Sequence, residues 1–147
     1  MRAKSNARSA RKKAKPSLGR ILVLEDDAIL AMALEDALLE GGAREVVIFS
    51  RADQALADLK ETRPDVLILD VHIADSDDGW AMAELATMLG PKPPRIVFST
   101  GAPEAIPAAI ASLGLVFEKP YDTTRLIDAL QNNTRKGIFS RLRTAIS

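Results

Sequence analysis

The stretch ILVLEDDAILAMALEDALLEGG, residues 21–42, contains one complete strand-and-helix unit. Its opening run of β-branched and Leu residues predicts a short strand over residues 20–24. Apolar residues then recur at helical spacing through residues 29–38, and Gly41 and Gly42 end that helix. Acids stand directly after the strand: Glu25, Asp26 and Asp27. A strand that leads through polar residues into a helix is typical of an α/β protein.

The same pattern recurs along the chain. Each of four further units pairs a short apolar run with a helical segment: 45–49 with 52–60, 65–69 with 80–89, 95–98 with a helix after 101, and 115–117 with 123–132. Five βα units predict a doubly wound α/β fold, in which helices cover both faces of a parallel sheet. Continuous apolar strands agree with this fold because both faces of such strands are buried.

Composition limits the functions that the chain can have. Its 147 residues, 47% of them hydrophobic, fit one globular domain. The absence of Cys and the single His exclude disulfide scaffolds, thiol catalysis, haem attachment and the usual Cys/His zinc sites. The longest strongly apolar runs, 21–24 and 66–69, are far shorter than a membrane span or a signal peptide. We expect a soluble cytoplasmic protein without a membrane span.

Charge is unevenly distributed along the chain, although 20 bases balance 20 acids. Residues 1–15 contain seven bases and no acid, residues 135–147 contain four bases and no acid, and the body between them is acidic. We interpret residues 1–18 as a disordered basic tail that keeps the protein soluble. An anionic membrane surface, a targeting presequence and nucleic acid are alternatives, but no aromatic residue is present for base stacking, so nucleic acid is disfavoured.

The segment 135–147 is predicted to be a basic amphipathic tail that follows a domain over 19–134. Its apolar residues stand at helical spacing: Ile138, Phe139, Leu142 and Ile146. The apolar side could pack on a partner, on a second subunit or on the body of the same molecule. Gly137 favours a break from the preceding helix.

Chemically active residues follow four of the predicted strands. In open parallel sheets the working residues gather beyond the carboxyl ends of the strands, where Glu25 and Asp26, Asp70, Thr100 and Lys119 stand. Clustered carboxylates without His or Cys suit Mg²⁺, which leaves positions for phosphate oxygens. A hydroxyl and an ammonium would bind those phosphate oxygens. Together these residues indicate phosphoryl transfer to a carboxylate.

Four pieces of the sequence carry a family resemblance: ILVLEDD at 21–27, VLILDV at 66–71, IVFSTGA at 96–102 and FEKP at 117–120. They resemble the receiver domain of two-component response regulators, and the resemblance covers roughly residues 20–132. It implies a flavodoxin-like (βα)5 fold with strand order 2-1-3-4-5.

The resemblance also implies a set of metal ligands. Glu25 and Asp26 correspond to the acidic pair that binds Mg²⁺, and Asp70 is a further ligand. The backbone carbonyl of His72 would complete the protein ligands. Asp27 is instead expected to cap the first helix.

The reaction implied by the resemblance is phosphorylation of Asp70. The donor is a phosphohistidine on a sensor histidine kinase or a histidine phosphotransfer protein. Thr100 corresponds to the hydroxyl residue that turns toward the phosphoryl group, and Lys119 to the family lysine. The Lys119-Pro120 peptide is expected to be cis.

The sequence departs from the family pattern at three places. Val116 stands where an aromatic switch residue is expected. Pro103 and Pro107 predict that the fourth helix is short or starts near Pro107. The loop after Asp70 is one residue longer than usual, and its acids, Asp75, Asp77 and Asp78, are interpreted as a solvated loop that turns at Gly79.

We therefore predict a single-domain response regulator, because some 15 residues after the last helix cannot hold an output domain. It would be a monomer or weak homodimer that is not an enzyme and signals to a downstream protein target by contact. A degenerate receiver that binds constitutively is the alternative. An aspartyl-phosphate phosphohydrolase is disfavoured, because that class has a second Asp at the position of His72.

Overall fold

The computed structural model describes residues 17–74 and 77–132; both basic segments and Asp75 lie outside this part. Five parallel strands form one sheet in the order β2-β1-β3-β4-β5. Their bounds are β1 Gly19–Leu24, β2 Ala43–Phe49, β3 Val66–Asp70, β4 Arg95–Thr100 and β5 Leu115–Glu118. The predicted doubly wound sheet and its strand order 2-1-3-4-5 are confirmed.

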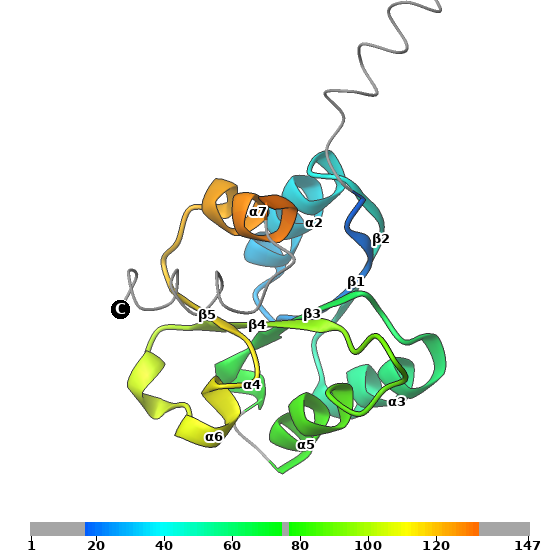
Figure 1. Cartoon of the computed structure of the whole chain (residues 1–147). Coiled ribbons are helices and arrows are strands. Elements are labelled where there is room, and N and C mark those ends of the chain that lie inside the picture. The colour runs from blue at the N-terminus through cyan, green and yellow to red at the C-terminus, as the bar shows by residue number, and fades with distance from the viewer. Residues whose placement is uncertain (1–16, 75–76, 133–147) are drawn as a thin grey trace, which may run out of the picture.

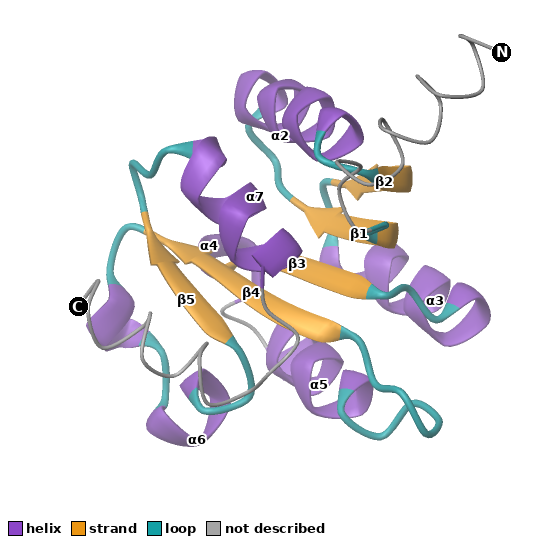
Figure 2. Ribbon diagram, turned by 45° about the horizontal axis from the view of Figure 1, so that its top comes forward, coloured by secondary structure: helices purple, strands orange, loops and turns teal. Residues whose placement is uncertain are grey.

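Helices pack on both faces of the sheet, as Figures 1 and 2 show. On one face lie α2 (Ala28–Glu40) and α7 (Thr123–Asn132); on the other lie α3 (Ala52–Thr62), α5 (Asp77–Ala86) and α6 (Ala108–Ala111). Because side chains alternate along a strand, each strand contributes to two cores. Val23, Ile68 and Val97 belong to the core under α2 and α7. The opposite core contains Leu22, Leu67 and Phe98.

The first helix begins where its cap was predicted. One carboxylate oxygen of Asp27 accepts hydrogen bonds from the N–H groups of Ile29 (2.9 Å) and Leu30 (3.1 Å). These bonds satisfy donors that have no partner inside the helix. The helix ends at Gly41, whose N–H donates to Ala37 O at 2.9 Å. The prediction that Asp27 caps this helix is confirmed.

The third long helix differs from its prediction. α5 begins at Asp77 and not at Trp80, so the interpretation of Asp77, Asp78 and Gly79 as a solvated loop with a turn is wrong. Acids are common in loops and in the first turn of a helix alike, so this composition does not distinguish the two. The helix also ends at Ala86, three residues before the predicted Leu89.

Three short helical segments follow β3 and β4. α4 (Val71–Ala74) directly follows β3 and was not predicted. The two prolines confine the next crossover to a 3-10 turn, η1 (Pro103–Ala105), and to the single turn of α6. The predicted shortening of that helix is confirmed. Within the described residues, no helix has the length and apolar character to cross a membrane.

We predict that Gly114→Ala destabilises the fold by about 1–3 kcal/mol, the usual cost of overpacking. A Cβ at this position would lie 2.3 Å from the carbonyl oxygen of Ile96, which belongs to the β4 backbone and cannot easily move. Urea unfolding measures the change. Gly101→Ala is the matched control, because a Cβ there meets no atom within 4 Å. Equal stabilities for the two variants would contradict this packing.

Candidate functional site

Four strand ends bring the predicted site residues to one edge of the sheet. There they line an open hollow of about 510 Å³, which is bordered by acids 25–27, Asp70, residues 100–102 and Lys119. Parallel strands place their carboxyl ends side by side, so residues far apart in sequence meet here. Glu25, Asp26, Asp70, Thr100 and Lys119 are all at this hollow.

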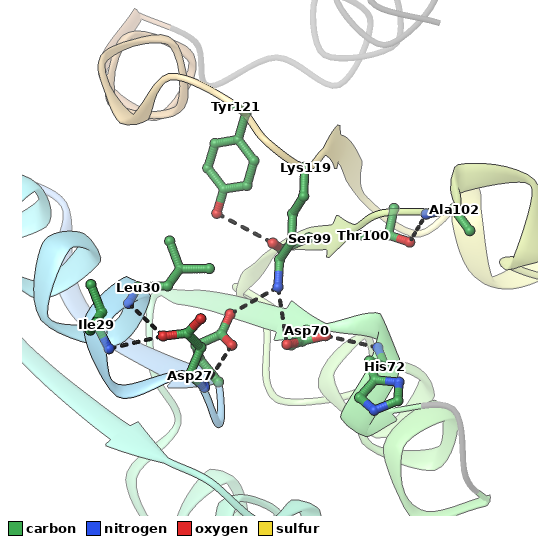
Figure 3. A network of polar contacts seen from close by, with 11 residues as sticks. Asp27, Ile29, Leu30, Asp70, His72, Ser99, Thr100, Ala102, Lys119 and Tyr121 are labelled. Carbon is green, nitrogen blue, oxygen red and sulfur yellow. Dashed lines mark hydrogen bonds and ion pairs between the residues drawn. The ribbon is translucent and has the colours of Figure 1, made fainter.

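The ammonium of Lys119 joins two buried carboxylates. Its Nζ lies 3.2 Å from Glu25 Oε1 and 3.1 Å from Asp70 Oδ2. Figure 3 shows the side chain of Lys119, which follows β5, pointing toward Asp70 at the end of β3. Glu25 is 3% exposed and Asp70 4% exposed. Both carboxylates therefore lie where an unpaired charge would be costly, and Lys119 neutralises part of that charge.

The pKa values of this cluster reflect its crowding. Burial raises the pKa of Glu25, and the nearby Asp70 adds to that rise against the opposing effects of the Asp27 N–H and Lys119. Burial lowers the pKa of Lys119, but its hydrogen bond to Asp70 and the charges of Asp70 and Glu25 outweigh burial and raise it. Lys119 is thus held firmly in its charged form.

Three carboxylates form a group that could hold a cation. Glu25, Asp26 and Asp70 each offer an oxygen, and these oxygens all lie within 4.8 Å of one another. Asp26 is exposed, so it leaves the group open to solvent. Oxygen ligands in this number suit Mg²⁺, which retains several waters when a protein binds it. The residues present fit that ion.

His72 lies next to this group but does not join it through its ring. Its side chain is exposed, and its backbone N–H donates to Asp70 Oδ1 at 2.8 Å. This bond fixes the second oxygen of Asp70 and helps to start α4 directly after the strand. Ligation through the carbonyl of His72 stays a prediction.

Thr100 is buried at the end of β4. Its hydroxyl accepts the N–H of Ala102 at 2.9 Å and is directed toward that residue in Figure 3. The backbone N–H of Lys119 donates to Thr100 O at 2.6 Å, which ties the two strand ends together. Val116, at the position of the expected aromatic residue, is buried in the core. The Lys119-Pro120 peptide is cis, as predicted.

One polar pair at this edge was not foreseen. Ser99 Oγ donates to Tyr121 Oη at 3.3 Å, and the Tyr121 ring meets Phe117 edge-on with centroids 5.5 Å apart. Burial raises the pKa of Tyr121. In the sequence, Ser99 stands at the end of a predicted strand and Tyr121 two residues after Lys119, so both are near the candidate site. Their contact is visible only once the ends of β4 and β5 are placed in space.

Comparison with known proteins gives a consistent result. The family model described as the response regulator receiver domain matches residues 21–131. Sensory transduction protein LytT of Bacillus cereus is 32% identical over an alignment of 117 positions that covers 76% of this chain and 46% of LytT. Chemotaxis protein CheY of Bacillus subtilis is 25% identical over 114 residues and is covered to 93%. The chain therefore spans about half the length of LytT and nearly all of CheY.

Solved structures with the same fold include two receiver domains. The response regulatory domain of MrkE from Klebsiella pneumoniae has a TM-score of 0.66 and 26% identity, over 83% of this chain and 98% of that one. A CheY-like receiver domain from Methylobacillus flagellatus has a TM-score of 0.67 and 23% identity, over 79% and 98%. The second likeness concerns the fold alone.

We predict that Lys119→Met lowers the free energy of unfolding in metal-free buffer by about 2 kcal/mol, because it leaves two buried carboxylates without their cation. Chemical denaturation with chelator present measures the loss. Adding Glu25→Gln to Lys119→Met should make this loss of stability smaller, since one of the two buried negative charges is then removed. Lys60→Met, at an exposed position, is the control and should change stability by less than about 0.5 kcal/mol. Equal effects of Lys119→Met and Lys60→Met would contradict the coupling.

Proposed function

This chain belongs to the response regulator receiver domain family, and on that premise we propose that Asp70 accepts a phosphoryl group from the phosphohistidine of a sensor histidine kinase or a histidine phosphotransfer protein. Receiver domains are signalling domains, so the product is a phosphorylated protein that signals by contact with a downstream target. The observation that carries the proposal is the buried Asp70 carboxylate, 3.1 Å from the Lys119 ammonium at an open hollow.

The proposed reaction is a transfer between two side chains. A carboxylate oxygen of Asp70 forms a bond to phosphorus while the bond from phosphorus to the imidazole nitrogen of the donor breaks. The electron pair of the broken bond stays on that nitrogen. Position and charge stabilisation do most of the work in such transfers, because little covalent machinery is needed.

Lys119 and Thr100 have separate roles in this proposal. The ammonium that now binds Asp70 Oδ2 would bind a phosphoryl oxygen after transfer, and its raised pKa supports a permanent positive charge. The Thr100 hydroxyl would leave the N–H of Ala102 and donate to another phosphoryl oxygen. That movement would change the conformation of residues 101–102, which lead into η1. No rotation of an aromatic side chain would accompany it at position 116, because Val116 is buried in the core.

Mg²⁺ is the cofactor we propose for this site. Glu25, Asp26 and Asp70 would hold it, with the carbonyl of His72 as the predicted further ligand. When bound, the ion offsets negative charge on the carboxylates and on the transferring phosphoryl group. Asp26 is exposed and all three acids line the open hollow, so a donor imidazole can approach them from solvent.

A partner has an apolar surface available beside this mouth. Ile29 and Met32 on α2 are 81% and 65% exposed, directly after the acids at 26 and 27. Side chains three apart on a helix lie on one face. We propose that the phosphodonor contacts this face during transfer, because its imidazole must come close to Asp70 over the same rim.

We predict that Asp70→Asn abolishes phosphorylation by acetyl phosphate with Mg²⁺, because the amide cannot act as the nucleophile. Intact mass spectrometry should show one added phosphoryl group on the parent chain. Trp80, which packs edge-on against Phe98 with ring centroids 6.3 Å apart, offers a fluorescence signal for the same event.

Asp65→Asn is the matched control, since this acid directly precedes β3 at the end of the strand away from Asp70 and should leave phosphorylation intact. Loss of the added mass in Asp65→Asn alone would contradict the assignment. An unmodified parent chain would favour the degenerate receiver that acts as a constitutive binding module.

We predict that Asp26→Asn weakens Mg²⁺ binding by roughly tenfold or more, since even residues that only orient a ligand change affinity by about 10–100-fold. Isothermal calorimetry measures it. Asp27→Asn removes the same charge one residue later, and it should change affinity by less than about threefold, because Asn still caps the helix. The reverse order of effects would show that the wrong acid is assigned to the metal.

A further inference from the structure

A buried hydroxyl lies beside the proposed phosphoacceptor and takes no part in the reaction described above. Ser99, near the end of β4, is 1% exposed and pairs in register with Asp70 at the end of β3. Side chains alternate along a strand, and the residues two positions earlier, Val97 and Ile68, belong to the same core. Ser99 and Asp70 therefore face the same side of the sheet, from strands that lie about 5 Å apart.

The Ser99 hydroxyl is directed to Tyr121 and not to the carboxylate opposite it. Ser99 Oγ donates to Tyr121 Oη at 3.3 Å, and Figure 3 shows the two hydroxyls pointing toward each other. Asp70 has other donors: Oδ1 accepts the N–H of His72 at 2.8 Å, and Oδ2 lies 3.1 Å from the Lys119 ammonium. A serine hydroxyl has a single donor, so donation to Tyr121 withholds it from Asp70.

The phenol that accepts this bond is held in place by packing. The ring of Tyr121 meets Phe117 edge-on with centroids 5.5 Å apart, and it packs against the core under α2 and α7. Burial raises the pKa of its phenol, and the charges of Lys119, Glu25 and Asp70 modify that pKa as well. The phenol oxygen is therefore a fixed acceptor within electrostatic reach of the reacting groups.

Without that acceptor, the Ser99 hydroxyl would have one close alternative. Its two register partners are Asp70 on β3 and Phe117 on β5, and only Asp70 has a side chain that accepts hydrogen bonds. A buried donor that loses its acceptor is destabilising, so the hydroxyl would turn to the carboxylate. Rotation about the first side-chain bond of serine makes this turn without a change in the backbone.

A hydrogen bond from Ser99 would make Asp70 a poorer nucleophile. Such a bond stabilises the charged carboxylate, and the oxygen that attacks phosphorus must give up that stabilisation during transfer. The ammonium of Lys119 differs in this respect, because its flexible stem lets it follow the negative charge to a phosphoryl oxygen. A short hydroxyl fixed on a strand cannot follow the charge in this way.

We propose that Tyr121 is a positioning residue for phosphorylation of Asp70: its hydroxyl oxygen accepts the Ser99 hydroxyl and so keeps a competing donor away from the carboxylate. The inference rests on the proposed function and extends it to two residues that do not line the hollow of the candidate site. Tyr121 thus acts through Ser99 and does not touch the phosphoryl group.

The test compares four full-length chains: the parent, Tyr121→Phe, Ser99→Ala and the double variant. Intact mass spectrometry follows the initial rate of phosphorylation by acetyl phosphate with Mg²⁺. Tyr121→Phe keeps the ring but should react roughly tenfold more slowly, the factor that one hydrogen bond to a charged group confers. Ser99→Ala and the double variant have no hydroxyl to misplace, so both should react within about twofold of the parent.

A second measurement tests the direction of the hydrogen bond without any phosphorylation. Tyr121 is the only Tyr in the chain, so a fluorotyrosine label gives one fluorine NMR signal that follows the titration of this phenol. Burial raises the pKa of Tyr121, and the hydrogen bond from Ser99 lowers it. Ser99→Ala should therefore raise the pKa further. Ser112→Ala, at an exposed position after α6, is the control and should leave the pKa unchanged.

Three results would overturn this inference alone. They are a Tyr121→Phe chain that reacts as fast as the parent, a double variant that reacts as slowly as Tyr121→Phe, and a Tyr121 pKa that falls or does not change in Ser99→Ala. A parent chain that is not phosphorylated would overturn the proposed function and this inference with it. Recovery of the rate in the double variant cannot come from restored packing, because that chain lacks both hydroxyls.

Discussion

The contact of Lys119 with two buried carboxylates is the constraint on which this edge of the molecule depends. Glu25 follows β1, Asp70 ends β3, and Lys119 follows β5, so one ammonium links the ends of the neighbouring strands β1 and β3 to that of β5, which is not adjacent to either. Without it, two acids would be buried side by side with no cation between them. The carboxylates must nevertheless stay charged if they are to attract a metal ion. Lys119 therefore offsets only part of the negative charge of Glu25, Asp26 and Asp70, and a bound cation would offset the rest.

This arrangement follows from the parallel sheet and its two cores. The strands are apolar on both faces because helices cover both, so polar groups can gather only at the strand ends. At the carboxyl edge those ends carry acids, a hydroxyl and an ammonium. Asp27 caps a helix at this same edge, where its carboxylate accepts hydrogen bonds from the N–H groups of Ile29 and Leu30. The adjacent Asp26 has its carboxylate near Glu25 and Asp70 instead, so two neighbouring residues of the same type differ in their contacts.

Periodicity and the family resemblance were enough to predict the sheet, its order, the cap at Asp27 and the residues that meet at the hollow. These features are local, or they follow from the rule that parallel strand ends share an edge. The start of α5 was missed because Asp77, Asp78 and Gly79 have the composition of a loop, although acids are also common in the first turn of a helix. The pair of Ser99 and Tyr121 was missed because it joins segments 22 residues apart across two strand ends.

Charge segregation along the chain became interpretable only through topology. The sequence separates basic segments from an acidic body, but it does not indicate that six of the nine bases in that body lie at one edge. In a parallel sheet, every strand starts at the same edge, so bases near strand starts, such as Arg44 and Arg95, accumulate there. Acids at strand ends accumulate at the other edge. The same topological rule thus brings Glu25, Asp70 and Lys119, which lie far apart in the sequence, to one edge of the sheet, where the two carboxylates share one ammonium.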